Sequence, residues 1–162
     1  MRGFTTNRLL IEDWTPHCRD AVRRSSLEDR LRGILTPAVL APLPPSFQLD
    51  QSGDVSGWID ARGAESEVAL IRHQDDRAIL GLLILARFDG EPPDIHIGYL
   101  FAEESWGRGY APEMLRGLAE ILDRPARLLA GVEADNAASA RVLEKAGFAQ
   151  DAHLGLYVRN LH

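Results

Sequence analysis

The sequence predicts a mixed α/β fold, in which three consecutive antiparallel strands precede a strand–helix–strand crossover. Three apolar, strand-like runs occupy residues 67–101, separated by short polar turns that favour hairpins. A strand and two helical patterns follow in alternation, and such an order favours a right-handed parallel crossover. Residues 106–111 form a glycine-rich connection at the start of that crossover.

The bulk composition is typical of a globular protein and argues against a nucleic-acid partner. The chain has 162 residues, which predicts one domain over residues 1–162. Its net charge of −6 lacks the positive field of a general nucleic-acid binder. No apolar run is long enough for a membrane span. A lone cysteine, Cys18, favours a reducing compartment, so the expected location is the cytoplasm.

The N-terminal half is expected to begin with a strand over residues 8–12. Thr15 is interpreted as an N-cap with Pro16 in the first helical position, followed by a helix over 17–35 that has a possible break at 23–26. Proline density over 36–53 predicts a long surface loop. A short helix over 54–62 then carries an apolar face of Val55, Trp58 and Ile59.

The remaining elements follow from periodicity and from turn residues. The run 78–86 is almost continuously apolar, which predicts a strand buried on both faces. Asn136 is the expected N-cap of a helix that ends at Gly147. The other expected elements are strands over 67–72, 95–101 and 127–134, a helix over 111–122, and a closing hairpin of 148–153 with 156–160 around Gly155.

The glycine-rich connection has the composition of an anion site. Gly107 and Gly109 allow backbone amides to crowd together, and the following helix adds the positive end of its dipole. A dinucleotide-binding Rossmann unit would place such a turn after its first strand, and the lysine of a P-loop is missing. The turn therefore suits a pyrophosphate of another kind.

A second block downstream makes the pattern specific. Residues 136–148 follow the crossover, and together with residues 8–11, 97–99 and 106–113 they resemble the GNAT superfamily of N-acetyltransferases. Within it, the chain is similar to the ribosomal-protein N-terminal acetyltransferases. The resemblance implies a mixed, mostly antiparallel sheet with flanking helices, whose fourth and fifth predicted strands, 95–101 and 127–134, splay apart.

The resemblance also implies that acetyl-CoA is the co-substrate and that no metal takes part. Backbone groups near Leu100, Phe101 and Ala102 would pair with the pantetheine arm, and one amide there would polarise the thioester carbonyl. Asn136 would hydrogen-bond near the pantetheine, and Ser139 would lie near the sulfur. The amides that would hold the pyrophosphate belong to Gly107, Arg108, Gly109, Tyr110 and Ala111, with a possible charged contact from Arg108.

Two positions depart from the family pattern. Trp106 stands where the pyrophosphate motif begins with Gln or Arg, and Leu143 stands where many members have a tyrosine acid. Ser139, a water molecule or direct protonation by solvent remain as sources of the proton for the thiolate. The general base is either His96, in a slot that often holds glutamate, or Glu133.

The function expected from these features is acetyl transfer from acetyl-CoA to a primary amine, by direct attack in a ternary complex. The acceptor is a protein N-terminus, a lysine or a small-molecule amine, and a homodimer is a common family arrangement. The alternative is a non-catalytic module that binds acyl-CoA and reports it to a partner, which the two departures would also suit. A nucleotide-binding regulator is a third interpretation.

Overall fold

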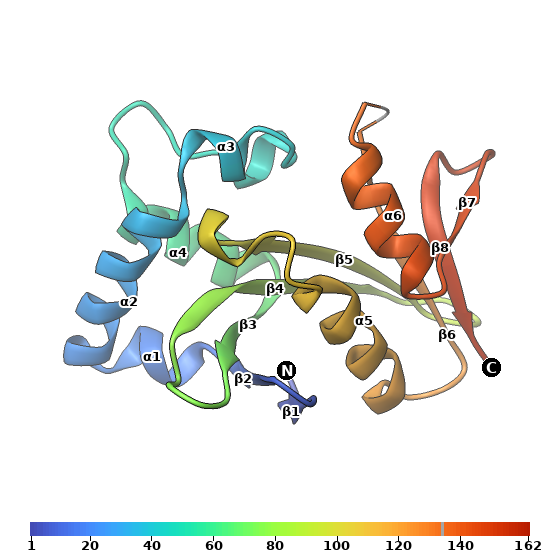
Figure 1. The fold of residues 1–162 in the computed structure, drawn as a ribbon, viewed down its shortest axis with the longest axis horizontal. Coiled ribbons are helices and arrows are strands. Elements are labelled where there is room, and N and C mark those ends of the chain that lie inside the picture. Colours follow the sequence, from blue (N-terminus) through green and yellow to red (C-terminus); the bar gives the residue numbers. More distant parts are fainter. Residues whose placement is uncertain (134) are drawn as a thin grey trace.

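The computed structural model describes residues 1–133 and 135–162 and confirms the mixed α/β fold (Figure 1). Within these ranges eight strands form one open sheet in the order β1-β2-β3-β4-β5-β6-β8-β7, and of its neighbouring pairs only β5 and β6 run parallel. The strands are β1 (Phe4–Thr5), β2 (Leu9–Asp13), β3 (Glu67–His73), β4 (Ile79–Phe88), β5 (Asp94–Phe101), β6 (Ala126–Ala130), β7 (Ala149–Asp151) and β8 (Leu156–Leu161). The helices are α1 (Thr15–Arg19), α2 (Ala21–Ile34), α3 (Pro37–Leu40), η1 (Pro45–Phe47), α4 (Val55–Glu65), η2 (Glu103–Ser105), α5 (Tyr110–Ile121) and α6 (Ala137–Lys145).

Helices cover both faces of the sheet, so the core has two parts. One hydrophobic cluster joins α5 and α6 to one face, and the other joins α2, α3 and α4 to the opposite face (Figure 1). Strand β4 contributes to both, because Leu83 and Leu85 belong to the first cluster while Leu82 and Ile84 belong to the second. The prediction that this strand is buried on both faces is confirmed.

The first long helix divides earlier than predicted. Asp20 is extended, with φ −82° and ψ 125°, and its side chain accepts a hydrogen bond from the backbone amide of Arg23. The break therefore lies at Asp20, where a new N-cap begins α2, and the predicted break at 23–26 was wrong. Thr15 is the first residue of α1 and not its N-cap, which is Trp14.

The proline-rich stretch contains short helices, and the prediction of a continuous loop over 36–53 was wrong in that detail. Pro37 lies in the first turn of α3, where a missing amide proton costs no helical hydrogen bond. The Thr36 hydroxyl accepts a hydrogen bond from the Val39 amide and caps this helix. Strand β1 was not predicted, since two residues that pair only with β2 give no periodic signal.

The crossover creates a gap between its two parallel strands. Asp94–His96 pair with Arg127–Leu129, and beyond His96 no described residue of β6 pairs with β5. Because β5 continues to Phe101, the two strands part over the second half of β5, as the family resemblance implied. Strand β6 ends at Ala130, so the predicted strand 127–134 was too long, and its residue 134 lies outside the described ranges.

The C-terminal elements agree with prediction. The Asn136 side chain accepts a hydrogen bond from the Ser139 amide at 3.1 Å and caps α6. Gly147 follows the end of α6 with a φ of 85°, a left-handed conformation that favours glycine. The closing hairpin of β7 and β8 turns at Gly155.

Candidate functional site

The connection between β5 and α5 is a turn whose shape depends on two glycines. Gly107 and Gly109 have φ angles of 72° and 78°, in the left-handed region. A Cβ atom on Gly107 would meet no atom within 4 Å, so the space beside the turn is open. Gly109 is the N-cap of α5 and provides no side chain to the first-turn amides. Those amides and the helix dipole therefore suit an anion.

The other residues of the turn would contribute through their backbone. The ring of Tyr110 is buried and stacks on Phe101, with ring centroids 6.4 Å apart. The Arg108 side chain is exposed, and the backbone carbonyl of Arg108 accepts a hydrogen bond from Arg8. Ala111 is half-buried in the first turn of the helix. The predicted amides of Arg108, Tyr110 and Ala111 therefore lie at the helix N-terminus, while the Tyr110 side chain belongs to the core.

The turn is fixed to the start of the chain by Arg8 and Glu113. Arg8 Nε donates to Glu113 Oε2 at 2.8 Å, and Arg8 Nη1 donates to the carbonyl of Arg108 at 2.9 Å. The Thr6 hydroxyl and the Arg8 amide both donate to Glu113 Oε1. Burial alone would raise the pKa of Glu113, but the hydrogen bonds from Thr6 and Arg8 outweigh it and lower that pKa. Arg8 also lies over the ring of Tyr110, 4.5 Å from its centroid.

Alternation along β5 decides which of its backbone groups face the gap. On the β4 side, the Ala102 amide donates to the carbonyl of Leu80. On the β6 side, the Pro93 carbonyl accepts from the Arg127 amide. Backbone groups of an antiparallel strand point to alternate sides, so those of Leu100 also face β4, whereas those of Phe101 face the gap. The backbone groups of Tyr99 face the gap by the same alternation, and they were not among the predicted partners of the pantetheine arm.

The Phe101 carbonyl already has a partner within the chain. Trp106 Nε1 donates to it at 2.9 Å, and the indole remains 51% exposed. Trp106 therefore connects the end of β5 to the glycine turn, which gives a structural role to the residue that departs from the family pattern. The Phe101 amide and both backbone groups of Tyr99 remain directed toward the gap.

The three predicted catalytic residues come from different elements. His96 is exposed on β5 at the point where the strands part, and its ring contacts Phe88 edge-on at a centroid distance of 5.0 Å. Glu133 is exposed in the loop beyond β6, and its carbonyl accepts from the Asn136 amide at 2.9 Å. Ser139 is half-buried in the first turn of α6. Among the described residues, no hydrogen bond joins the side chains of these three.

Two other side chains limit the chemistry available beside the gap. Leu143 is 1% exposed, so the position of the family's tyrosine acid is part of the core here. Tyr99 packs against the same cluster, and burial raises its pKa to about 12. The Tyr99 side chain is therefore packed against the core.

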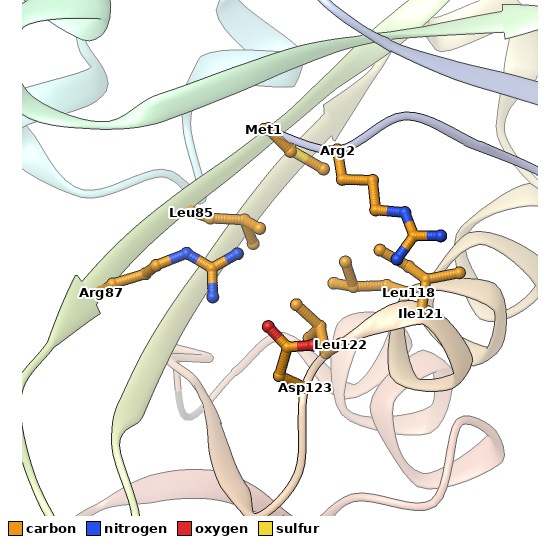
Figure 2. Close-up of a pocket in the computed structure, with 8 residues that line it drawn as sticks. All are labelled: Met1, Arg2, Leu85, Arg87, Leu118, Ile121, Leu122 and Asp123. Carbon is orange, nitrogen blue, oxygen red and sulfur yellow. The ribbon is translucent and has the colours of Figure 1, made fainter.

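A small cavity lies at the opposite end of α5 from the glycine turn (Figure 2). Its volume is about 70 Å³, far below the usual size of a ligand pocket. Its lining residues are Met1, Arg2, Leu85, Arg87, Leu118, Ile121, Leu122 and Asp123. Since α5 rises about 1.5 Å per residue, this cavity is too far from the turn to belong to the same site.

Within residues 1–133 and 135–162, no cluster of three or more His, Cys, Asp or Glu side chains is arranged to hold a metal ion. The helices in the same ranges are too short or too polar to cross a membrane.

Sequence reasoning missed one buried charged residue. Arg62 on α4 is 4% exposed and lines a pocket formed with the segment that follows α3. The signal was present in the sequence, because Arg62 continues the helical spacing of Val55, Trp58 and Ile59 and therefore lies on the buried face.

The open sheet, its parallel crossover and the glycine turn define an acyltransferase of the GNAT type. The family model described as "Acetyltransferase (GNAT) domain" matches residues 8–149, and the chain therefore belongs to the GNAT acetyltransferase family. This confirms the family and the enzyme class that the sequence predicted. A search of curated proteins found no significant match.

Solved structures of low sequence identity share the fold. A GNAT-family acetyltransferase from Bacillus anthracis has a TM-score of 0.76 at 17% identity, with 98% of each chain covered. RimJ of Mycobacterium smegmatis, solved with a CoA disulfide, has a TM-score of 0.72 at 18% identity, with 98% of this chain and 86% of that chain covered. RimL, a ribosomal L7/L12 α-N-protein acetyltransferase solved with coenzyme A, has a TM-score of 0.68 at 18% identity, with 99% and 98% covered.

Proposed function

We propose that this protein transfers the acetyl group of acetyl-CoA to a primary amine by direct attack in a ternary complex. The observation that carries the proposal is the glycine turn at the N-terminus of α5, beside the gap between β5 and β6. This arrangement offers an anion site and an unpaired strand edge next to each other. A pyrophosphate and an extended pantetheine arm have the complementary features.

Each part of the cofactor has a candidate partner in the chain. The amides of Gly107, Arg108, Gly109, Tyr110 and Ala111 would bind the pyrophosphate. In the gap, Tyr99 and Phe101 would hydrogen-bond the pantetheine arm, with Leu100 and Ala102 holding that strand edge against β4. The Phe101 amide would also donate to the thioester carbonyl oxygen as negative charge develops there. The RimL and RimJ structures, which hold coenzyme A or its disulfide, support this assignment.

The proposed reaction needs a neutral amine and a stabilised thiolate. The amine nitrogen attacks the thioester carbon, the carbon–sulfur bond breaks, and coenzyme A leaves as the thiolate. His96 or Glu133 would take the proton that the amine loses, directly or through a water molecule. The thiolate would receive its proton from Ser139, from water or from solvent. Asn136 uses its side-chain oxygen as the helix cap, which leaves its amide nitrogen as a donor toward the pantetheine.

The acceptor belongs to the proposal only as a class of compound. It is a primary amine, which includes a protein N-terminus, a lysine or a small-molecule amine. The name of RimL, an α-N-protein acetyltransferase, favours testing protein N-termini first. The proposal also includes a single catalytic domain, a possible homodimer and a cytoplasmic location, which suits the half-buried thiol of Cys18.

The experiment that tests the cofactor site compares two glycine variants. Gly109→Glu would place bulk and negative charge where the pyrophosphate is expected, and should abolish acetyl-CoA binding measured by calorimetry. Gly155→Glu is the control, because Gly155 also has a positive φ, of 66°, and tolerates a Cβ atom with nothing within 4 Å, but it lies in the β7–β8 turn. Equal binding by wild type and Gly109→Glu would contradict the proposed site.

A non-catalytic acyl-CoA-binding module is the second candidate. The burial of Leu143 at the position of the family's tyrosine acid favours it. Release of the coenzyme A thiol across a panel of primary amines separates the two functions. Binding of acetyl-CoA without thiol release from any amine would favour the module.

A further inference from the structure

A second pocket lies between helix α4 and the segment that includes η1. Its volume is about 290 Å³, close to the lower end of the range for ligand pockets. The residues that line it are Ser46, Gln48, Leu49, Asp50, Asp54, Gly57, Trp58, Ala61 and Arg62. Of these, only Arg62 has a positively charged side chain.

Arg62 is almost fully buried and incompletely paired. Its Nη2 atom lies 3.2 Å from Glu65 Oε2, but Glu65 is 59% exposed, so water weakens this pair. The Nε and Nη1 atoms are buried and have no hydrogen-bond partner among the described residues. Burying a guanidinium group is unfavourable unless its donors are satisfied. The free donors therefore indicate a ligand group that bears negative charge.

Aromatic rings hold the guanidinium group in place and connect it to β5. The Arg62 Cζ atom lies 5.1 Å from the ring centroid of Phe47 and 6.0 Å from that of Trp58. On β5, a Cβ atom added to Gly98 would lie 3.0 Å from Phe47 Cε2. One aromatic ring thus separates Arg62 from Gly98, which lies two residues beyond the point where β5 parts from β6.

We propose that this pocket binds a carboxylate group of the amine acceptor, with Arg62 as the residue that recognises it. The inference rests on the proposed function, because it takes the gap beside Gly98 as the place of acetyl transfer. An acceptor whose amine reaches that gap would extend its carboxylate past Phe47 toward Arg62. Arg62 is then a specificity-determining residue for acceptors that carry both an amine and a carboxylate.

The two aspartates of the pocket favour a carboxylate over a phosphate. Asp54 Oδ1 accepts from the Gly57 amide and caps α4, and Asp50 Oδ1 accepts from the Ser52 amide in a local turn. Neither forms an ion pair with Arg62. Their negative charge still repels a dianion more strongly than a monoanion. A carboxylate therefore suits the pocket better than a phosphate group.

The test compares amine acceptors that differ only in the carboxylate. One pair is 6-aminohexanoate and 6-aminohexanamide, and the other is the peptide amides Ser-Glu-Ala and Ser-Gln-Ala. Wild type should show a kcat/KM for the carboxylate member that is about 10- to 100-fold higher, as expected for a charge-assisted hydrogen bond. Arg62→Gln should bring the two members to similar values. Arg23→Gln, at an exposed arginine on α2, is the matched control and should keep the wild-type preference.

A second variant leaves Arg62 in place. Ser46 is exposed at the pocket, so Ser46→Glu adds a competing carboxylate without removing a core contact. It should reduce the preference in the same direction as Arg62→Gln. If Arg62→Gln does not fold, Ser46→Glu decides the result. The proposal is overturned if Arg62→Gln, or Ser46→Glu where Arg62→Gln does not fold, keeps the wild-type preference for the carboxylate acceptor. It is also overturned if wild type uses the carboxylate and amide acceptors equally well.

A binding measurement separates this proposal from the proposed function. Hexanoate, a monoanion, is titrated into the full chain by calorimetry, and Arg62→Gln should weaken its binding at least about tenfold. Arg62-dependent hexanoate binding without thiol release from any amine would support the anion pocket and contradict the proposed acetyl transfer. Thiol release without discrimination between the paired acceptors would overturn the acceptor assignment while the transfer stands. Displacement of hexanoate by equimolar inorganic phosphate would overturn the choice of a carboxylate.

Discussion

Asp94 on β5 and Arg127 on β6 form a bidentate ion pair at the closed end of the gap between these strands. Arg127 Nε and Nη2 donate to the two carboxylate oxygens of Asp94, each at 2.7 Å, and the two residues are also register partners in the parallel ladder. The hydrogen bonds from Arg127 hold the pKa of Asp94 below its ordinary value. The strands part after His96, so this pair fixes the point from which the gap opens.

Loss of this pair should weaken cofactor binding more than it lowers stability. We expect Arg127→Gln to raise the Kd for acetyl-CoA about two- to fivefold, the effect of one exposed ion pair. Calorimetry measures the Kd, and thermal unfolding measures stability. Arg87→Gln is the control, because Arg87 makes a similar exposed pair with Glu67 on the β3–β4 hairpin, away from the gap. Equal increases in the Kd for acetyl-CoA in Arg127→Gln and Arg87→Gln would show that cofactor binding does not depend on the place of the Asp94–Arg127 pair beside the gap.

The carboxylate of Glu113 should contribute both to stability and to the glycine turn. It accepts hydrogen bonds from Thr6 and Arg8, and Arg8 in turn donates to the carbonyl of Arg108. Glu113→Ala should lower the free energy of unfolding by about 1–3 kcal/mol and also weaken acetyl-CoA binding. The control is Glu120→Ala on the exposed face of the same helix, which should change stability by less than about 0.5 kcal/mol. Urea unfolding provides both values.

The same carboxylate predicts a pH dependence. The pKa of Glu113 in the folded protein lies below its ordinary value of 4.5, because hydrogen bonds from Thr6 and Arg8 outweigh burial. Its stabilising effect is therefore fully present above the ordinary value and is lost as the pH falls through the folded value. The stability difference between wild type and Glu113→Gln should be largest above pH 4.5 and should shrink in more acid solution. A difference that grows on acidification would contradict this sign.

The parts of the fold that could be predicted from sequence have local causes. Gly107 and Gly109 require a left-handed backbone, and Asn136 caps the helix that begins beside it. These features depend on neighbours in the chain, so residue types and spacing were sufficient. The break between the first two helices lies at Asp20 and not at the predicted 23–26, because either of these two polar positions could have ended the first helix. In the structure, the side chain of Asp20 accepts a hydrogen bond from the Arg23 amide and begins α2 there.

The parts of the candidate site that were missed depend on pairing and burial. Which backbone groups of β5 face the gap follows from its pairing with β4, and sequence alone does not fix whether Leu100 or Phe101 does so. A charged residue such as Arg62 is usually exposed, so its place on the apolar face of α4 was not taken as a sign of burial. The rings of Phe47 and Trp58 lie beside the guanidinium group of Arg62 and help to bury it. Both residues are far from β5 in the sequence.

Asn136 should have two separable roles. Asn136→Ala removes the cap of α6 and should lower the free energy of unfolding by about 1 kcal/mol. Asn136→Asp retains a capping oxygen but loses the amide donor proposed for the pantetheine. We therefore expect Asn136→Asp to be near wild type in thermal unfolding and weaker than wild type in acetyl-CoA binding. If Asn136→Asp binds acetyl-CoA as wild type does, the residue is a cap only.

The identity of the general base is the last point that mutation can resolve. His96 is exposed where the strands part, and Glu133 is exposed beyond the end of β6. Removing a true general base should lower kcat about 10²- to 10⁴-fold. His96→Gln and Glu133→Gln, assayed by thiol release with saturating acetyl-CoA, should therefore lose kcat to very different extents. The variant with the small loss of kcat serves as the control for the other.

The pH profile of kcat gives an independent answer. A histidine base makes kcat fall on the acid side of neutrality, whereas a glutamate base stays deprotonated until much lower pH. If His96 is the base, His96→Gln removes this acid limb from the residual activity, and Glu133→Gln retains it. Small losses in both variants with unchanged profiles would mean that neither side chain takes the proton. The amine would then have to lose its proton to solvent before it binds, and the rate would follow the fraction of neutral amine.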